Sequence, residues 1–406
     1  MSSERAAVGA DAFPWRILGL TLLAQWAAAT GNQALTAVVP FFKSELGLSL
    51  TQTGLLVAAV QIGSASGYLP GGAIGDRLGM RTTIAGGIVG IGVLLAVASR
   101  AEQFPVALAT MFCVGTMAAV ALPGITVAVF QWFSPRARGT AMGVKATGVP
   151  LSGIVAATTI PSLALLVGWR NGLALLALAV LTSGIVFGLN FRERDRDVRP
   201  RGGAKPRSLD LFRNRNLMIL NLFGLSLISA QFATLTYLML YLRDVFGFDL
   251  VAAGYVLAYA QAVGMASRIG WGVVSDQVFG GARKPVIVAA GVIGSIASLL
   301  LGLVTPEQPT VLLVVAATLL GVSAIGWNSI YQIAIPELVR PEQAGAAVGL
   351  SFTLTSSAAI VGPPLFGLIV DTSGSYASAW LALAGVCAAL TIIAAIFLRE
   401  RKLDPR

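Results

Sequence analysis

The feature that most constrains this chain is a series of apolar runs, each about twenty residues long, that recur along its whole length. A helix of that length spans the hydrocarbon core of a bilayer. Of the 406 residues, 56% are hydrophobic and 11% are charged, whereas a soluble domain carries about a quarter charged residues. A single soluble core stops growing well before it could bury all of these runs. The sequence therefore predicts an all-α integral membrane protein.

Twelve transmembrane helices are expected, and a polar segment separates the first six from the last six. The expected helices are 15–40, 52–72, 82–99, 104–130, 139–166, 170–190, 216–243, 250–274, 284–304, 309–335, 344–370 and 376–398. The first run is too long for the apolar part of a cleaved signal peptide. We expect an N-terminal six-helix bundle at 1–190, a cytoplasmic linker at 191–215 and a C-terminal six-helix bundle at 216–406.

The positions of the basic residues predict the orientation. With both termini on one side, 22 of the 28 lysines and arginines fall on that side and four on the other, while Lys145 and Arg268 lie within helices. Basic residues are enriched in cytoplasmic loops. We therefore expect a multi-pass protein of a bacterial inner (plasma) membrane with both termini in the cytoplasm. The net charge of +10 then reflects orientation in the lipid bilayer, and no nucleic-acid partner is expected.

The residues that most enzymes need for catalysis are missing. The chain has no histidine, and its two cysteines, Cys113 and Cys387, lie in apolar runs without the spacing of metal ligands. No Gly-x-Ser-x-Gly motif is present. We therefore expect no enzymatic activity, no catalytic residues, no metal site and no cofactor.

The two halves of the chain repeat each other weakly. The stretch GGAIGDRLGMR (71–81) is echoed by RIGWGVVSDQVFGGARKP (268–285), and RGTAMG (138–143) is echoed by AGAAVG (344–349). Such repetition is typical of secondary transporters, whose substrate site lies between the repeats near the middle of the membrane.

The stretch 72–81 resembles a signature of one transporter family, the loop between helices 2 and 3 of the major facilitator superfamily, G-x-L-A-D-R-x-G-R-K. The matching positions are Gly72, Asp76, Arg77, Gly79 and the basic residue Arg81, whereas Met80 replaces a usual basic residue. The resemblance implies twelve helices in two six-helix bundles related by pseudo-two-fold symmetry, and transport by alternating access.

The same resemblance implies a gating role for these residues. Asp76 would hold helix 2 against helix 11 while the outside is open, and Arg268, Asp276 and Arg283 would be the counterpart in the second half. The physical reason is separable from the family. Glycines allow helix ends to approach closely, and an aspartate can accept hydrogen bonds from the free N–H groups of a neighbouring helix N-terminus.

Lys145 is the charge that fits the predicted membrane topology least well. It lies inside the fifth expected helix, and Ser152 and Thr159 follow at seven-residue spacing on the same face. A charge within a transmembrane helix usually faces a water-filled interior and is functional. A cation without an acidic neighbour suits an anionic substrate. The alternative is that Lys145 extends its side chain to the cytoplasmic surface.

Other polar residues suggest the rest of a substrate site, because the resemblance implies that helices 1, 4, 7 and 10 line the central cavity. The selected residues are Gln25, Asn32, Gln231, Tyr237, Tyr259, Asn328 and Tyr331. Any one of them could instead be a hydrogen-bond partner between helices. Proline and glycine in TGVPLSG (147–153) and VGPPLFG (361–367) further predict bends in helices 5 and 11.

The absence of acids from the expected helix interiors distinguishes between transporter classes. Proton-driven drug exporters of the superfamily typically carry an intramembrane acid, and helices 1 and 4 offer none here. We therefore expect a monomeric carrier of small, monocarboxylate-like organic anions, resembling bacterial oxalate, cyanate and monocarboxylate carriers. Protons are a candidate coupling ion. The alternative is an exporter of amphipathic drugs or metabolites.

Overall fold

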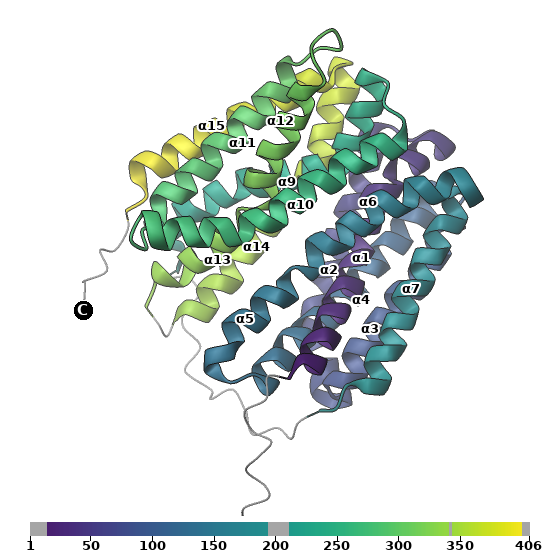
Figure 1. The fold of residues 1–406 in the computed structure, drawn as a ribbon, viewed down its shortest axis with the longest axis vertical. Coiled ribbons are helices and arrows are strands. Elements are labelled where there is room, and N and C mark those ends of the chain that lie inside the picture. Colours follow the sequence, from purple (N-terminus) through teal and green to yellow (C-terminus); the bar gives the residue numbers. More distant parts are fainter. Residues whose placement is uncertain (1–13, 194–210, 341–342, 400–406) are drawn as a thin grey trace, which may run out of the picture.

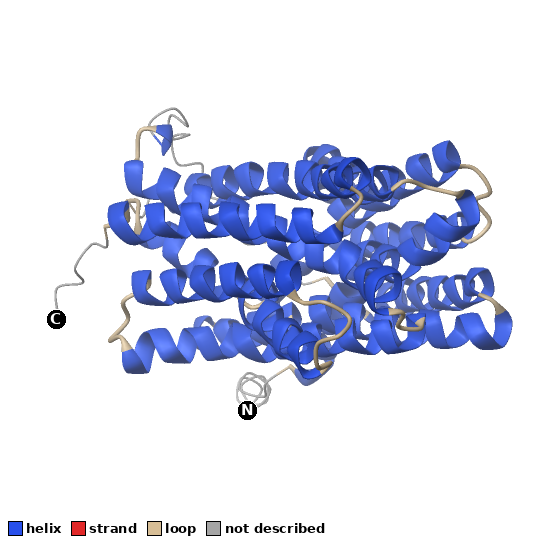
Figure 2. Cartoon of the chain, turned by 90° about the horizontal axis from the view of Figure 1, so that it is seen from above, coloured by secondary structure: helices blue, strands red, loops and turns tan. Residues whose placement is uncertain are grey.

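The computed structural model describes residues 14–193, 211–340 and 343–399, in which all regular structure is helical (Figure 2). Figure 1 shows two bundles side by side, one from α1 to α7 and one from α9 to α15. The first contains α1 (Trp15–Leu46), α2 (Leu50–Leu78), α3 (Met80–Ala98), α4 (Phe104–Trp132), α5 (Pro135–Ala146), α6 (Gly148–Val167) and α7 (Trp169–Asn190). The second contains α9 (Arg215–Phe246), α10 (Leu250–Val273), the π-helix η1 (Val274–Val278), α11 (Lys284–Leu303), α12 (Val311–Leu320), the π-helix η2 (Gly321–Ile325), α13 (Asn328–Glu337), α14 (Ala344–Ser373) and α15 (Tyr376–Phe397).

The helices form twelve passes because three passes consist of consecutive segments: α5 with α6, α10 with η1, and α12 with η2 and α13. Ten helices among the described residues are long and apolar enough to cross a membrane, and α1 and α2 are of similar length but fall outside that set. The expected all-α architecture of two six-pass bundles is confirmed. The domain limits stay a prediction, because residues 194–210 of the expected linker lie outside the described residues.

The first turn of each bundle is built in the same way. Gly47 and Gly247 end α1 and α9 with φ of 62° and 71°, a left-handed conformation that favours glycine. Two residues later, Ser49 and Asp249 cap α2 and α10 by accepting hydrogen bonds from backbone N–H groups of the next turn. At this turn the two halves therefore repeat each other in structure.

The stretch 71–81 differs from its expected loop structure. We expected one helix to end at residue 72 and the next to begin at 82, but α2 continues to Leu78 and α3 begins at Met80. Gly79 alone separates them, with φ of 84°. Hydropathy marks the apolar part of a helix, whereas the polar end of α2 stays helical until a residue with positive φ interrupts it.

The molecule has two ends at which the helices are connected, the linker face and the opposite face. The linker face carries Asn190 and Arg215, which flank the expected linker, and the turn at Gly79. The opposite face carries the turns at Gly47 and Gly247.

The two bundles meet closely near the opposite face. A Cβ atom on Gly367 of α14 would lie 2.3 Å from the Leu50 carbonyl oxygen of α2, and one on Gly254 of α10 would lie 2.2 Å from the Ala157 carbonyl oxygen of α6. Backbones from the two halves are therefore in direct contact there.

Near the linker face, glycines of facing helices are free of such contacts. Cβ atoms built on Gly143 of α5, Gly270 of α10 and Gly345 of α14 would meet nothing within 4 Å. The direct backbone contacts between the halves thus lie toward the opposite face, and in Figure 1 the ribbons of the two bundles diverge toward α5 and α13.

Candidate functional site

Lys145 lies in the last turn of α5, beside a break in the fifth pass. The break is at Thr147, whose backbone N–H bonds the Val144 carbonyl, and α6 begins at Gly148. The fifth pass is therefore interrupted at the start of the stretch 147–153, whereas α14 continues as one helix through its prolines. Lys145 is 8% exposed, and its Nζ donates a hydrogen bond of 2.7 Å to Oγ1 of Thr126 on α4.

The ammonium group of Lys145 has a neutral partner, and no carboxylate in the described residues pairs with it. The ion pairs of these residues lie at helix ends: Lys43–Asp244, Arg170–Glu45, Arg243–Asp244, Arg283–Asp276 and Arg283–Glu337. A buried charge without a counter-charge is costly in a membrane protein. The arrangement is therefore suited to an anion that comes from outside the protein.

Amide side chains of α1 lie next to this break. Cγ of Gln25 would be 3.1 Å from a Cβ on Gly148. Nε2 of Gln33 donates to the Gln261 Oε1 atom at 3.3 Å and to the Val149 carbonyl at 3.5 Å. The Gln33–Gln261 bond connects the two bundles, because Gln261 belongs to α10.

Two predicted amide residues of α1 have oxygen atoms that the protein leaves unbound. Oε1 of Gln25 and Oδ1 of Asn32 are buried and have no hydrogen-bond partner among the described residues. Buried polar groups are normally hydrogen-bonded. These two amides therefore keep unused capacity for accepting hydrogen bonds, Gln25 beside the break near Lys145 and Asn32 about two turns further along α1.

In the second bundle, three predicted site residues form hydrogen bonds with neighbouring side chains. Gln231 Oε1 accepts hydrogen bonds from Trp327 Nε1 at 3.3 Å and Asn328 Nδ2 at 3.0 Å. The Tyr331 hydroxyl donates to Asn221 Oδ1 at 2.8 Å. The pairs connect α9 with the tenth pass, and they hold polar atoms that we expected to face a substrate.

Tyr237 lies in the contact between the bundles. Its hydroxyl is close to two carbonyl oxygens from different halves, Leu50 at 2.9 Å and Pro363 at 2.6 Å, and its side chain is fully buried. The structure therefore places Tyr237 in the closed opposite face and not beside Lys145.

Tyr259 lies on an outer surface of α10. It is 43% exposed, and it shares an exposed stripe with Ile269 and Val273. Its hydroxyl bonds Oγ1 of Thr318 on α12 at 3.0 Å. An exposed apolar stripe on a transmembrane helix faces lipid, so this placement separates Tyr259 from the other predicted site residues.

The predicted gating residues of the first half are only partly described. The surroundings of Gly72 and of the Asp76 side chain lie outside what the structure describes. Arg77 is exposed at the end of α2. Arg81 lies in the first turn of α3, where its backbone N–H donates to Glu193 Oε1 at 2.5 Å and its Nε donates to the Gly188 carbonyl.

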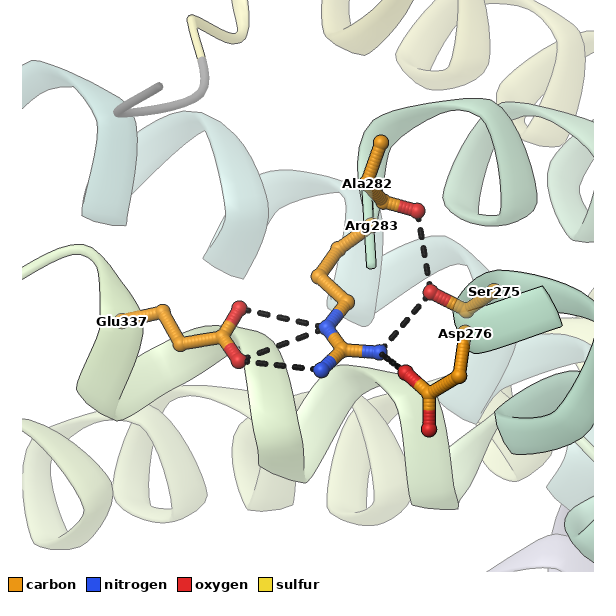
Figure 3. Close-up of polar contacts among 5 residues, drawn as sticks. All are labelled: Ser275, Asp276, Ala282, Arg283 and Glu337. Carbon is orange, nitrogen blue, oxygen red and sulfur yellow. Dashed lines mark hydrogen bonds and ion pairs between the residues drawn. The ribbon is translucent and has the colours of Figure 1, made fainter. Parts of the chain in front are cut away.

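The corresponding cluster in the second half is centred on Arg283 (Figure 3). Its guanidinium bonds Asp276 Oδ1 at 2.6 Å, Ser275 Oγ at 2.8 Å and the Glu337 carboxylate at 3.2 Å. Partial burial lowers the pKa of Arg283, but hydrogen bonds and charges of Glu337 and Asp276 outweigh that effect and raise it. The cluster connects the eighth, ninth and tenth passes within one bundle.

Arg268 does not belong to this cluster, although we expected it to act with Asp276 and Arg283. Its Nε donates to the Ile325 carbonyl at 3.2 Å, and its own carbonyl accepts from Ser329 Oγ at 2.7 Å. Arg268 lies two turns before Asp276 and within the predicted membrane span.

Three functional contacts were not selected from the sequence. Thr126 binds Lys145, Glu337 completes the Arg283 cluster, and Asp371 of α14 caps α2. Only Glu337 and Asp371 had a detectable signal, since each is an acid at the end of an apolar run. Thr126 resembles many other threonines in these helices.

A family model described as Major Facilitator Superfamily matches residues 21–363 and 269–406. The chain belongs to the Major Facilitator Superfamily. This membership confirms the resemblance carried by residues 72–81. The protein is therefore a multi-pass membrane transporter and not an enzyme.

Relatives of this superfamily transporter cover nearly its whole length. An uncharacterised MFS-type transporter of Mycobacterium tuberculosis is 28% identical over 393 residues, which are 95% of this chain and 85% of that protein. The hexuronate transporter of Bacillus subtilis is 25% identical over 382 residues, 90% of each chain. A bacterial homologue of the human lysosomal transporter Spinster has a TM-score of 0.74 at 17% identity, covering 95% of this chain and 96% of that chain, and so shares the fold.

Proposed function

We propose that this transporter carries small organic anions by alternating access and binds their acidic group at Lys145. The observation that carries the proposal is the buried Lys145 ammonium, which contacts the hydroxyl of Thr126 and no described carboxylate. A substrate carboxylate would supply the missing counter-charge. The similarity to a protein named as a hexuronate transporter supports an organic-acid substrate.

The arrangement of the halves supports a site that is reached from one side. The bundles touch through Gly367 and Gly254 near the opposite face and are apart at Gly143 and Gly270 toward the linker face. The excess of basic residues near the linker face supports an orientation with this face in the cytoplasm. The described conformation would then open Lys145 to the cytoplasm of a bacterial cell, with both termini on that side.

The test uses purified transporter in liposomes and a panel of labelled carboxylates. We compare the natural chain with the variants Lys145→Gln and Lys145→Ala. Loss of a buried charged partner should lower carboxylate uptake at least about tenfold. Lys145→Arg, which keeps the charge, should retain part of the uptake.

The matched control is Arg100→Gln. It also removes one cation, but from an exposed site where the guanidinium bonds Asn171. Its uptake should equal that of the natural chain. Carboxylate uptake that survives both Lys145→Gln and Lys145→Ala would overturn the proposal.

A further inference from the structure

We infer that three arginines at the linker face of the second bundle, Arg213, Arg215 and Arg399, bind the headgroup of an anionic phospholipid. The site is separate from Lys145, which belongs to the first bundle. It does not depend on what the transporter carries, so it can be tested apart from the proposed function.

The three arginines come together where α9 begins and α15 ends. Arg213 and Arg215 are two residues apart at the start of α9. The Arg399 backbone N–H donates to Asn216 Oδ1 at 3.1 Å, so Arg399 lies beside the first turn of α9. The Arg215 guanidinium lies over the Phe397 ring, 5.1 Å from its centre. Residues from the first and last passes of the second bundle therefore form one basic group.

The backbone that carries two of these arginines is held in place. Asn214 caps α9, and its Nδ2 donates to the Leu338 carbonyl at the end of α13 at 2.9 Å. Leu211 is buried in the core of the second bundle. Arg213 and Arg215 thus extend from fixed backbone positions, which lowers the entropy lost when a ligand binds.

The charges of the three arginines are uncompensated within the described part of the chain. None of the three takes part in an ion pair there. Other exposed arginines bond oxygen atoms of the protein: Arg16 bonds Asn190 Oδ1 at 3.0 Å, and Arg100 bonds Asn171 Oδ1 at 3.2 Å. A guanidinium can bind two phosphate oxygens at once, so a group of free arginines suits a phosphate diester.

The group lies at the depth of phospholipid headgroups. The helix α15 has 22 residues and is therefore about 33 Å long, which covers the hydrocarbon core of a bilayer. Its end at Phe397 is then at one membrane surface, and Arg399 lies just beyond it.

Apolar side chains next to the arginines face the lipid. Phe212, Ile396 and Phe397 are 50%, 64% and 43% exposed, and α15 lies at the outer edge of the second bundle in Figure 1. Basic clusters at a membrane surface attract anionic headgroups. A phospholipid would contact both the arginines and this apolar surface, whereas a soluble acidic partner would contact the arginines alone. The combination therefore favours a lipid.

The experiment measures lipid binding to the purified full-length protein in detergent by native mass spectrometry. Phosphatidylglycerol, which is anionic, is compared with phosphatidylcholine of the same acyl chains. We expect phosphatidylglycerol to bind at least about tenfold more tightly, because each basic residue near the headgroup strengthens the attraction. Equal affinities for the two lipids would overturn the inference.

A double variant assigns the preference to this site. Arg213→Gln/Arg215→Gln should weaken phosphatidylglycerol binding about tenfold and leave phosphatidylcholine binding unchanged, which shows that the variant is folded. Arg213→Lys/Arg215→Lys keeps both charges and should stay within about threefold of the natural affinity. Unchanged phosphatidylglycerol binding in the Gln variant would count against the site.

The matched control is Arg16→Gln/Arg192→Gln, which removes two exposed cations from the linker face of the first bundle. Its affinity for phosphatidylglycerol should change less than about twofold. An equal loss of affinity in both double variants would mean that only the total surface charge matters, and the site would be disproved.

A competition assay separates a lipid site from a site for a soluble phosphate diester. Glycerophosphoglycerol has the headgroup of phosphatidylglycerol without its acyl chains. We expect that a large excess of it leaves phosphatidylglycerol bound, because it lacks the apolar part. Full displacement would assign the arginines to a soluble anion and refute the lipid site. None of these measurements uses transport, so their failure leaves the proposed role of Lys145 untouched.

Discussion

At the residue scale, the hydroxyl of Thr126 is the described group that holds the Lys145 ammonium in place. A lysine stem has four rotatable bonds, so a fixed partner lowers the entropy lost when an anion binds. Thr126 is half-buried on α4 and belongs to the same bundle as Lys145. We therefore regard it as a positioning residue.

Replacing Thr126 by valine tests this role, because it removes the hydroxyl at similar volume. We expect KM for the transported carboxylate to rise about three- to tenfold with little change in kcat, since a hydrogen bond to a charged group is lost. Thr126→Ser should restore the natural KM. An unaltered KM in Thr126→Val, measured by initial uptake rates, would refute the positioning role.

The cluster around Arg283 allows a prediction on pH. The pKa of Arg283 is raised by its two acids, and a cation with a raised pKa contributes its stability fully below its unfolded pKa and loses it only as pH rises through the folded value. Both values lie far above neutral pH. Glu337→Gln should therefore lower the free energy of unfolding by about 0.5–1 kcal/mol equally at pH 6, 7.5 and 9.

Unfolding of the detergent-solubilised protein measures that effect, with Glu102→Gln as an exposed control acid. A loss of stability that disappears within this pH range would contradict the assignment.

At the residue level, the sequence identifies a residue that differs in type from its surroundings. Lys145 is a charge in an apolar helix, and that property is visible without coordinates. For Gln231 and Tyr331, the polar type was visible, but their bonds to Asn328 and Asn221 depend on how α9 packs against the tenth pass. A sequence does not show whether a polar side chain has a hydrogen-bond partner in the folded protein.

At the element scale, the antiparallel helices α2 and α14 connect the two bundles at the opposite face. Asp371 near the end of α14 accepts hydrogen bonds from the backbone N–H groups of Leu50 at 3.0 Å and Thr51 at 2.8 Å, and from the Thr51 hydroxyl at 2.6 Å. A carboxylate at a helix N-terminus is favoured by the free N–H groups and by the helix dipole. This cap joins the two bundles.

Asp371→Asn should loosen the closed opposite face. Asn keeps one acceptor oxygen but loses the negative charge and the second oxygen that Thr51 uses. The weakened hydrogen bonds cost about 1–2 kcal/mol, which corresponds to a shift of roughly five- to thirtyfold in the ratio of the two conformations. Spin-label distances between the outer ends of α2 and α14 would measure the shift. Asp249→Asn is the matched control, because Asp249 caps α10 within its own bundle. Identical distances in both variants would rule out Asp371 as a connection between the halves.

The helices themselves show what hydropathy predicts. The number, order and apolar parts of the twelve passes follow from runs of hydrophobic residues, because each run must cover the bilayer thickness. Their ends and irregularities do not, since α2 extends to Leu78 and the π-helices η1 and η2 interrupt passes with no proline at the break. These details depend on solvent-exposed turns and on packing between passes.

At the scale of the whole molecule, the two ends of the α2–α14 pair are related. Asp371 is near the N-terminus of α2 at one end, and continuing the antiparallel pairing brings the backbone position of Asp76 opposite the N-terminus of α14 at the other. The cap at Asp371 belongs to the described conformation. A contact at Asp76 in the alternative conformation stays a prediction.

The transport mode follows from how the whole protein changes shape. If closure of the linker side encloses the Lys145 charge without an anion, the empty transporter crosses slowly. We expect exchange of internal for external substrate to be at least about tenfold faster than net efflux into substrate-free buffer. Lys145→Gln should bring the two rates closer together. Equal rates of exchange and net efflux in the natural chain would contradict this account.

The backbone contacts at Gly54 and Gly367 also affect how the transporter can be inhibited. In the described conformation a Cβ on either glycine would overlap backbone atoms of the facing helix. A small molecule arriving at the opposite face would have to separate main chains before it found any surface to bind. Compounds that lock this conformation should therefore enter between α5 and α10, and with the proposed orientation they would act from the cytoplasm.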